Sequence, residues 1–376
     1  MNAPLKRVVI KGTGSYLPND PIPNSRIDEV LGPLDQAPPR VQSFIASIGA
    51  RMLGASGVEY RHFAIDLETG RLTHTVASLA EATCRKALED AGKDASEIDL
   101  LVMASSNYDE STPPTSTLLQ ERLGIETCAE MEIHSNCSGV GKAMMVAYDA
   151  LRLGHYRTAL VVYPQISSVY LRRVYLNQPQ MNKKQAALRY ILADGGGAVV
   201  LEAVDAPAGQ SVPHEILGTF VESVGGKKPP AMTAGGGVSN LVDPDQQIPA
   251  MWAAGLHHLD QDFAAVDRDA GRILFEGVVR MMERLKLAPK TVDHFVFSIP
   301  TKQLYDDNLG RFIDYFGITA DQAKFQARET GYCGGASLLL HFDQMARRGE
   351  FKPGNVVVVH SVESSKWMTA GFAVRW

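Results

Sequence analysis

The sequence lacks the features that mark three large classes of protein. No apolar run reaches the roughly 18 residues that a bilayer-spanning helix needs, so no membrane-spanning segment is expected. No basic cluster is dense enough to neutralise a phosphate backbone, and the net charge of −5 gives no reason to expect nucleic acid as a partner. The N-terminus lacks the apolar core of a secretory signal, which makes a cytoplasmic location the simplest expectation.

Cysteine is scarce as well, and its spacing excludes further classes. The four cysteines lie far apart without the paired spacing of a metal site, so we expect no bound metal and a reducing compartment. A Gly-x-Gly at residues 12–14 follows a strand-like run, but the third glycine of a dinucleotide-binding motif is missing, and Pro18 stands where a helix should begin. We therefore predict a strand ending in a glycine turn, and no permanently bound cofactor.

The composition and the order of patterns predict an internally duplicated α/β fold. The chain exceeds an ordinary single domain, and 45% of its residues are hydrophobic, as in a globular protein with a sizeable core. A helical pattern is followed by near-continuous apolar strands, which is typical of a sheet covered on both faces. The same order recurs after Asp269, so the halves are predicted as residues 1–204 and 205–376. The predicted helices cover residues 74–91 and 273–285, and the predicted strands cover residues 98–104, 158–163, 294–299 and 355–360.

One segment, residues 132–154, places a cysteine between a strand and a helix. Apolar residues lead into Cys137 like the end of a buried strand, and others recur after it at helical spacing. A helix N-terminus favours the thiolate, which is the nucleophilic form of cysteine. The alternative is a small buried cysteine that only packs, and the local pattern does not decide between the two.

Three other segments are predicted to lie outside the core. Residues 170–190 are too polar for core, and their basic side chains form either a landing patch for an acidic carrier protein or a solvated loop. Residues 225–244, rich in glycine and proline, are predicted as an exposed excursion that lines part of a substrate tunnel. His257 and His258 lack evident partners for a metal site and are predicted to be exposed.

Six segments carry a pattern that can be compared with known families: residues 12–18 (GTGSYLP), 57–64 (GVEYRHFA), the Cys137 turn, 193–201 (ADGGGAVVL), 271–275 and 371–376. Together, in this order, they resemble the ketoacyl synthase III family of the thiolase-like superfamily. The resemblance implies two fused βαβαβαββ halves in a five-layer αβαβα arrangement and a homodimer. It also implies that Cys137 carries an acyl group from coenzyme A or an acyl carrier protein, while backbone N–H groups stabilise the oxyanion by about 3 kcal/mol each.

The departures from the family pattern concern the catalytic partners of the cysteine. Decarboxylating members use a histidine and an asparagine from the second half, and alignment places Ser298 and Tyr332 at those positions. A hydroxyl and a phenol donate hydrogen bonds but do not take a proton near pH 7 as imidazole does. By resemblance, decarboxylative condensation is therefore not expected.

Three residues are candidates for a substitute base. His360 and Glu363 lie where the family has a run of glycines, and each either supplies the base or only makes loop hydrogen bonds. Glu110 lies in a loop that, in the family, reaches the partner's active site across the dimer, and some thiolase-like enzymes use a glutamate from this region to deprotonate a substrate.

The resemblance and its departures predict an acyltransferase. The acyl group would pass from a coenzyme A or carrier-protein thioester to Cys137, and then to a hydroxyl, an amine or a carbon acid, in specialised-metabolite or polyketide biosynthesis. Two alternatives stay open. The chain is a non-catalytic ketosynthase-like subunit of a heterodimer, or it is an ordinary fatty-acid-initiating condensing enzyme.

Overall fold

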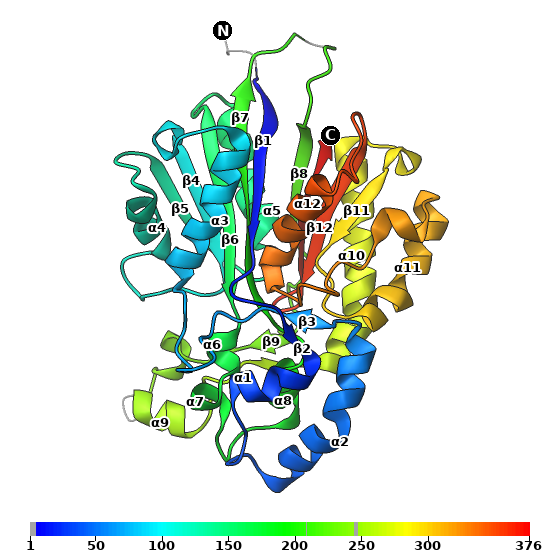
Figure 1. The fold of residues 1–376 in the computed structure, drawn as a ribbon. Coiled ribbons are helices and arrows are strands. Elements are labelled where there is room, and N and C mark those ends of the chain that lie inside the picture. Colours follow the sequence, from blue (N-terminus) through cyan, green and yellow to red (C-terminus); the bar gives the residue numbers. More distant parts are fainter. Residues whose placement is uncertain (1–4, 208, 244–246) are drawn as a thin grey trace.

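Nine strands form the centre of the protein in two groups (Figure 1). The computed structural model describes residues 5–207, 209–243 and 247–376. The first group has the order β5-β4-β6-β7-β1, and the second has the order β8-β13-β12-β11. They are joined by a single residue pair, Val9 of β1 with Glu215 of β8, so they act as two sheets. The strands are β1 (Arg7–Tyr16), β4 (Leu100–Ser105), β5 (Ala129–His134), β6 (Thr158–Ile166), β7 (Asp194–Val204), β8 (Glu215–Ser223), β11 (His294–Phe297), β12 (Val356–Glu363) and β13 (Met368–Arg375).

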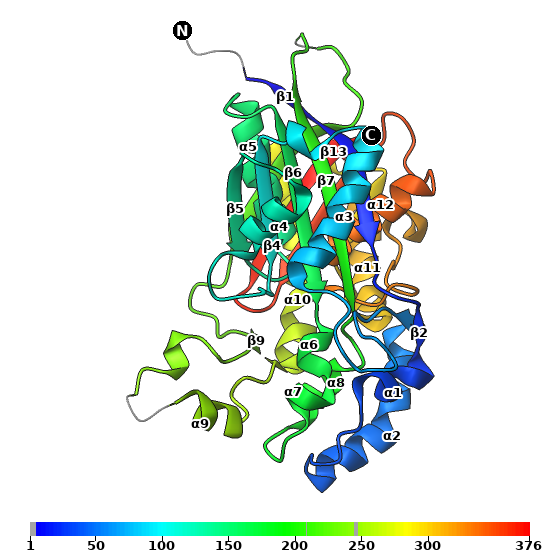
Figure 2. The same cartoon turned by 60° about the vertical axis from the view of Figure 1, so that its left-hand side comes forward.

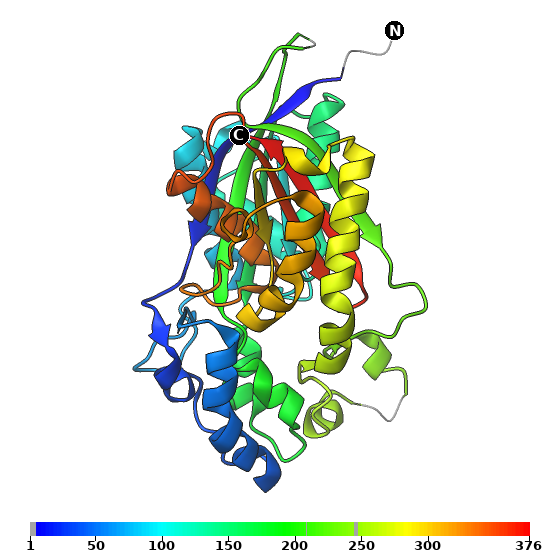
Figure 3. The same cartoon turned by 90° about the vertical axis from the view of Figure 1, so that its right-hand side faces the viewer.

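Helices cover both outer faces of the two sheets and fill the space between them. Helices α5 (Gly139–Arg152) and α12 (Ser337–Arg347) lie between the sheets and contact strands of both. Helices α3 (Val76–Ala91) and α4 (Thr115–Leu123) cover the first sheet. Helices α10 (Phe263–Leu285) and α11 (Lys302–Phe316) cover the second sheet and face the viewer in Figure 3. The five layers confirm the expected thiolase-like fold class. No helix of the described ranges is long and apolar enough to cross a bilayer.

The glycine turn predicted after the first strand is wrong. Gly12 and Gly14 lie inside β1, which continues to Tyr16. A Cβ atom at Gly12 would clash with the backbone of Ala91, and one at Gly14 would clash with the backbone of Ala87. The glycines therefore let α3 pack directly on the strand, which is a contact between distant segments and leaves no local pattern.

A smaller lobe lies below the sheets in the views of Figures 1 and 2. It contains the segment at residues 170–190, which was predicted as a polar loop but forms three short helices with Leu188 and Tyr190 in a buried cluster. The elements of this lobe are β2 (Ile22–Pro23), α1 (Ile27–Leu31), α2 (Pro39–Ser56), β3 (Tyr60–Arg61), α6 (Ser168–Leu171), α7 (Arg173–Leu176), α8 (Lys183–Leu188), β9 (Met232–Thr233), α9 (Ile248–Ala253) and β10 (Asp260–Gln261). Short 3-10 helices are distributed along the whole chain and are η1 (Asn24–Arg26), η2 (Ala95–Glu97), η3 (Val238–Asn240), η4 (Pro289–Thr291), η5 (Ala320–Ala323) and η6 (Gly334–Ala336).

The prediction of exposed histidines in this lobe is also wrong. His257 and His258 are buried, and the ring of His257 stacks on Trp252 with centroids 3.7 Å apart. Aromatic neighbours from α7 and α9 supply the cover that the sequence did not reveal. The excursion predicted at residues 225–244 is mostly exposed as far as it is described, and Pro244 lies outside the described residues.

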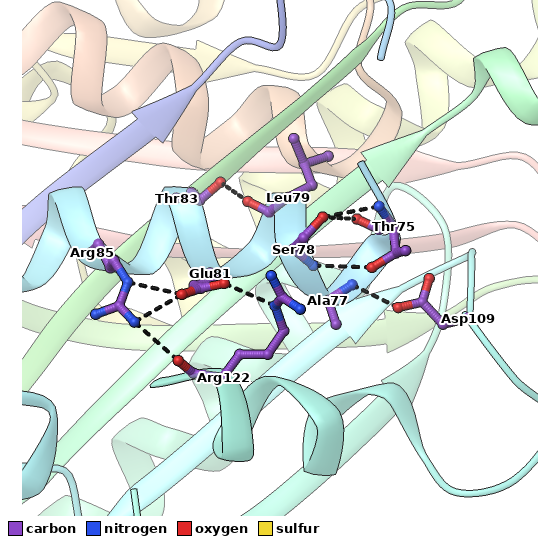
Figure 4. Close-up of polar contacts among 9 residues, drawn as sticks. All are labelled: Thr75, Ala77, Ser78, Leu79, Glu81, Thr83, Arg85, Asp109 and Arg122. Carbon is purple, nitrogen blue, oxygen red and sulfur yellow. Dashed lines mark hydrogen bonds and ion pairs between the residues drawn. The ribbon is translucent and has the colours of Figure 1, made fainter. Parts of the chain in front are cut away.

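The first turn of α3 holds the loop that carries Glu110 (Figure 4). Thr75 and Ser78 form a capping box, in which each side chain accepts from the other residue's backbone N–H. The carboxylate of Asp109 accepts a hydrogen bond from the backbone nitrogen of Ala77 at 2.9 Å, so a negative charge lies at the positive end of the helix. This contact fixes the loop next to Glu110. Figure 4 also shows Glu81 paired with Arg85 and Arg122.

Candidate active site

Cys137 lies at the turn between β5 and α5, where the sequence predicts it. Helix α5 begins at Gly139, where a Cβ atom would come within 2.7 Å of the Tyr163 ring, so a larger residue would push the turn away from the sheet. Ser135 and Ser138, on either side of the cysteine, are buried. The side chain of Cys137 keeps some accessible surface and lines a cavity.

Two further predicted residues lie next to the sulfur. The phenol oxygen of Tyr332 is 3.0 Å from Sγ of Cys137, and the hydroxyl of Ser298 is 3.3 Å from that phenol oxygen. Ser298 also donates to the carbonyl of Gly334 at 3.0 Å. Tyr332 follows Gly331, whose φ of 74° favours glycine and turns the chain into the site. The structure thus brings Cys137, Tyr332 and Ser298 into one hydrogen-bonded chain.

All three members of this chain are neutral near pH 7. Burial raises the pKa of the Cys137 thiol to about 12, the hydrogen bond with Tyr332 lowers it, and the charge of Glu363 raises it further. Burial and the neighbouring sulfur raise the pKa of the Tyr332 phenol well above its ordinary value. Burial is the largest contribution at this sulfur and keeps the pKa of the thiol above its ordinary value despite the hydrogen bond with Tyr332.

Glu363, a predicted base, is a fully bonded anion behind the cysteine turn. Its Oε2 accepts from the hydroxyl of Ser135 at 2.8 Å, and from the hydroxyl and backbone nitrogen of Ser138 at 2.5 and 3.1 Å. Its Oε1 accepts from Ser365. Burial raises its pKa, but these hydrogen bonds and the ammonium of Lys142 outweigh burial and lower the pKa overall. The carboxylate is absent from the cavity wall, which supports the alternative that it makes loop hydrogen bonds.

His360, the other base predicted in this loop, faces away from the cysteine. It lies on β12 next to Ser361, whose hydroxyl donates to the carbonyl of Cys137 at 2.7 Å. Successive side chains of a strand point to opposite faces, so His360 faces α10, with its ring centroid 6.0 Å from that of Phe220. Burial lowers its pKa to about 3. The prediction that His360 supplies the base is therefore wrong.

A cavity of about 110 Å³ extends from the sulfur between α10 and α11. Its walls are mostly apolar. Among the described residues that form them, three have ionisable side chains: Cys137, Tyr332 and Asp267. No histidine lines this cavity within the described chain, so an imidazole partner for Cys137 is not found there. The lining residues are Cys137, Ile191, Leu192, Met232, Gln261, Phe263, Val266, Asp267, Ala270, Gly271, Leu274, Ser298, Ile299, Pro300, Thr301, Leu304, Asn308, Tyr332, Val362 and Ser364.

Comparison with known proteins gives consistent matches. The family described as 3-oxoacyl-(acyl-carrier-protein) synthase III matches residues 131–219, which include the Cys137 turn. AbyA1, a tetronic acid condensing enzyme, is 24% identical, with a TM-score of 0.75 over 98% of this chain and 100% of its own. FabH from Pseudomonas aeruginosa is 20% identical, with a TM-score of 0.76 over 98% of each chain. A variant of OleA from Xanthomonas campestris is 19% identical, with a TM-score of 0.76 over 100% of each chain.

The chain has the thiolase-like fold of these structures, and its residues 131–219 match the 3-oxoacyl-(acyl-carrier-protein) synthase III family. Tyr332 contacts the sulfur of Cys137 and Ser298 contacts Tyr332, and these are the two positions where the resemblance implies asparagine and histidine. Glu110 is exposed and is absent from the cavity wall of its own chain. Its expected role concerns a partner subunit and stays a prediction.

Sequence reasoning missed three polar residues of the cavity wall. Gln261, Asp267 and Asn308 line the cavity, and none was singled out. The helix predicted from residue 273 begins at Phe263, so its first turns were treated as loop. Extending the helical period backwards places Asp267 one turn before Gly271 on the same face, and this signal would have found it.

Proposed function

We propose that the protein is an acyltransferase that loads an acyl group from a coenzyme A or carrier-protein thioester onto Cys137 and passes it to a hydroxyl or amine acceptor. The observation that carries the proposal is the neutral chain from Cys137 through Tyr332 to Ser298, in a cavity where no described residue contributes an imidazole. The matches to ketoacyl synthase III-like proteins support the use of an acyl thioester.

The first half-reaction needs no external base. Attack of Cys137 on the thioester forms a new C–S bond, releases the donor thiol and leaves the number of bound protons unchanged. Tyr332 can pass its proton to the departing sulfur and receive the proton of Cys137, because its oxygen lies 3.0 Å from Sγ. The hydroxyl of Ser298 can donate its single proton either to the carbonyl of Gly334 or to the phenol oxygen, and in the second orientation it holds Tyr332 in place and leaves the phenol proton free for the transfer.

The second half-reaction has the same balance when the acceptor is a hydroxyl or an amine. The acceptor loses one proton as its oxygen or nitrogen bonds to the acyl carbon, and Cys137 regains one as its C–S bond breaks. A carbon acid instead requires a base and a group that stabilises the enolate. The cavity wall of the described chain offers neither a histidine nor a lysine for this, which favours oxygen or nitrogen acceptors.

Intact-protein mass spectrometry with a panel of acyl-coenzyme A and acyl-carrier-protein thioesters tests the proposal. We expect a mass gain of one acyl group that Cys137→Ala abolishes. Tyr332→Phe keeps the ring but removes the relay, and should slow loading roughly 100-fold or more. Tyr305→Phe, in a phenol that does not line the cavity, is the matched control and should load normally. Loading that depends neither on Cys137 nor on Tyr332 would count against the proposal.

The high thiol pKa is the observation that favours the second candidate, a non-catalytic subunit of a heterodimer. We propose a homodimer instead, in line with the family resemblance. Co-purification of the chain from its native host separates the two: a homodimer that acylates itself excludes the non-catalytic role, whereas a stable complex with a second ketosynthase and no self-acylation supports it.

A further inference from the structure

The cavity wall carries polar side chains with atoms that have no partner in the described protein. Gln261 on β10 is 9% exposed and lines the cavity, and its side chain makes no hydrogen bond within the described chain. The polar atoms of this amide keep accessible surface in the cavity, so they are free to bind a polar group of a ligand.

Asn308 on α11 presents a second free acceptor. Its Nδ2 donates to the carbonyl of Leu304 at 2.8 Å, so the amide orientation is set and Oδ1 is left without a protein donor in the described ranges. A Cβ atom at Gly271 would clash with this amide, which shows that α10 leaves room for Asn308 at this point. The amide oxygen therefore lies beside the face of α10 that lines the cavity.

The charge of the cavity wall has one sign. Asp267 is exposed and is the charged residue of the cavity wall, with no lysine, arginine or histidine beside it there, and it forms no ion pair in the described chain. Asp307, next to Asn308, forms none either within the same ranges. Burial and then the charge of Asp307 raise the pKa of Asp267, so an added positive charge would relieve both effects.

We propose that Asp267, Gln261 and Asn308 form a subsite for the cationic amino group of the acyl acceptor, so that the acceptor class is small amino alcohols and diamines. This inference rests on the proposed acyl transfer to oxygen or nitrogen. The ammonium donates to the carboxylate and to the two amide oxygens. The second nucleophilic group of the acceptor then points toward Cys137. An anionic acceptor would meet Asp267 with no compensating cation.

Three alcohols of nearly equal size test the subsite. The acyl-Cys137 protein is treated with 4-amino-1-butanol, 1-pentanol or 4-hydroxybutyrate, which place a cation, no charge or an anion at the same distance from the attacking hydroxyl. We expect loss of the acyl group to be fastest with the amino alcohol, by about tenfold or more over pentanol, and slowest with the acid. Equal rates for the three compounds would overturn the subsite.

Two variants test whether Asp267 is responsible for the preference for the amino alcohol. Asp267→Asn should bring the ratio of the amino-alcohol rate to the pentanol rate, both measured on the same protein, close to one, since the amide keeps the shape and loses the charge. Asp307→Asn is the matched control, because Asp307 does not line the cavity, and it should keep most of the preference. If the Asp267→Asn protein retains the full preference, the assignment is wrong.

A binding measurement separates this inference from the proposed function. Calorimetric titration of the unacylated protein with 4-amino-1-butanol and 1-pentanol needs no acyl donor. Tighter binding of the amine in wild type, lost in Asp267→Asn, supports the subsite even if Cys137 is never acylated. Loading of Cys137 without any amine preference in binding or discharge would retain the acyltransferase and reject the subsite.

Discussion

The two faces of the strand pair β12–β13 differ in whether their buried polar side chains have hydrogen-bond partners. On the face toward the cysteine turn, Ser361 and Glu363 make hydrogen bonds that fix the nucleophile. On the face toward α10, both ring nitrogens of His360 and the hydroxyl of Thr369 are buried without a partner in the described chain. The residues alternate along the same strands, so strand register rather than residue type decides which groups serve the site.

The first prediction compares the packing on the two faces by adding one methyl group to the helix that lies against each of them. A Cβ atom at Gly141 of α5 would come within 2.6 Å of the Gly371 backbone nitrogen, whereas one at Gly277 of α10 would meet the side chain of Thr369 at a similar distance. Backbone cannot rotate away, so Gly141→Ala should cost about 3 kcal/mol and Gly277→Ala about 1 kcal/mol. Urea unfolding measures both, and an equal cost would contradict the tighter packing of the cysteine side.

A second prediction removes the charge on the cysteine side. Glu363→Gln should lower the free energy of unfolding by about 2 kcal/mol, because the amide cannot accept as many hydrogen bonds as the carboxylate. The same change removes a negative charge that raises the pKa of Cys137, so alkylation of this thiol at pH 8 should become faster, by about tenfold for each unit that the pKa falls. The measurement is the pH profile of iodoacetamide labelling.

Controls separate the charge of Glu363 from simple loosening of the turn. Cys128→Ser serves as the background, because Cys128 is the other cysteine with accessible surface. Ser365→Ala removes a hydrogen bond to the same carboxylate but keeps its charge, and should leave the labelling profile near that of wild type. A profile that shifts equally in both variants would mean that the turn, and not the charge, controls the thiol.

The same comparison shows what the sequence could predict. The Cys137 turn, the main helices and the apolar strands followed from local periodicity, because buried strands and amphipathic helices carry their pattern within one segment. The apolar run indicates that β12 ends near residue 360, but the strand continues through polar residues to Glu363. If the strand is extended from residue 360 to residue 363, the alternation of its side chains places His360 and Glu363 on opposite faces.

Other features depend on contacts that no single segment records. The glycines of β1 are explained by the approach of α3, and the helices at residues 170–190 are too short to show a full helical period. The polar part of the cavity wall combines β10, α10 and α11, so Gln261, Asp267 and Asn308 meet only in the folded chain. A local sequence pattern does not show that residues from three separate elements meet, so this part of the site could not be predicted from the sequence.

The smallest expected effect at neutral pH comes from the face toward α10. His360→Leu removes a buried ring with two unbonded nitrogens, so at pH 7.5 the free energy of unfolding should change by less than about 1 kcal/mol or rise. His341→Leu is the matched control: His341 has the same lowered pKa of about 3 but bonds Thr330 at 3.0 Å, and its loss should destabilise the protein at this pH.

At acidic pH we expect His360→Leu to have a larger effect on the free energy of unfolding. The unfolded chain binds a proton on this histidine below its ordinary pKa of 6.5, whereas the folded chain does so only near 3, so the fold loses stability as the pH falls between these values. At pH 5 the loss is about 2 kcal/mol. His360→Leu should therefore be more stable than wild type at pH 5, with the gain shrinking toward pH 7.5. Parallel stability curves for the two proteins would show that this imidazole finds a partner, and the contrast between the two faces of β12–β13 would then fail.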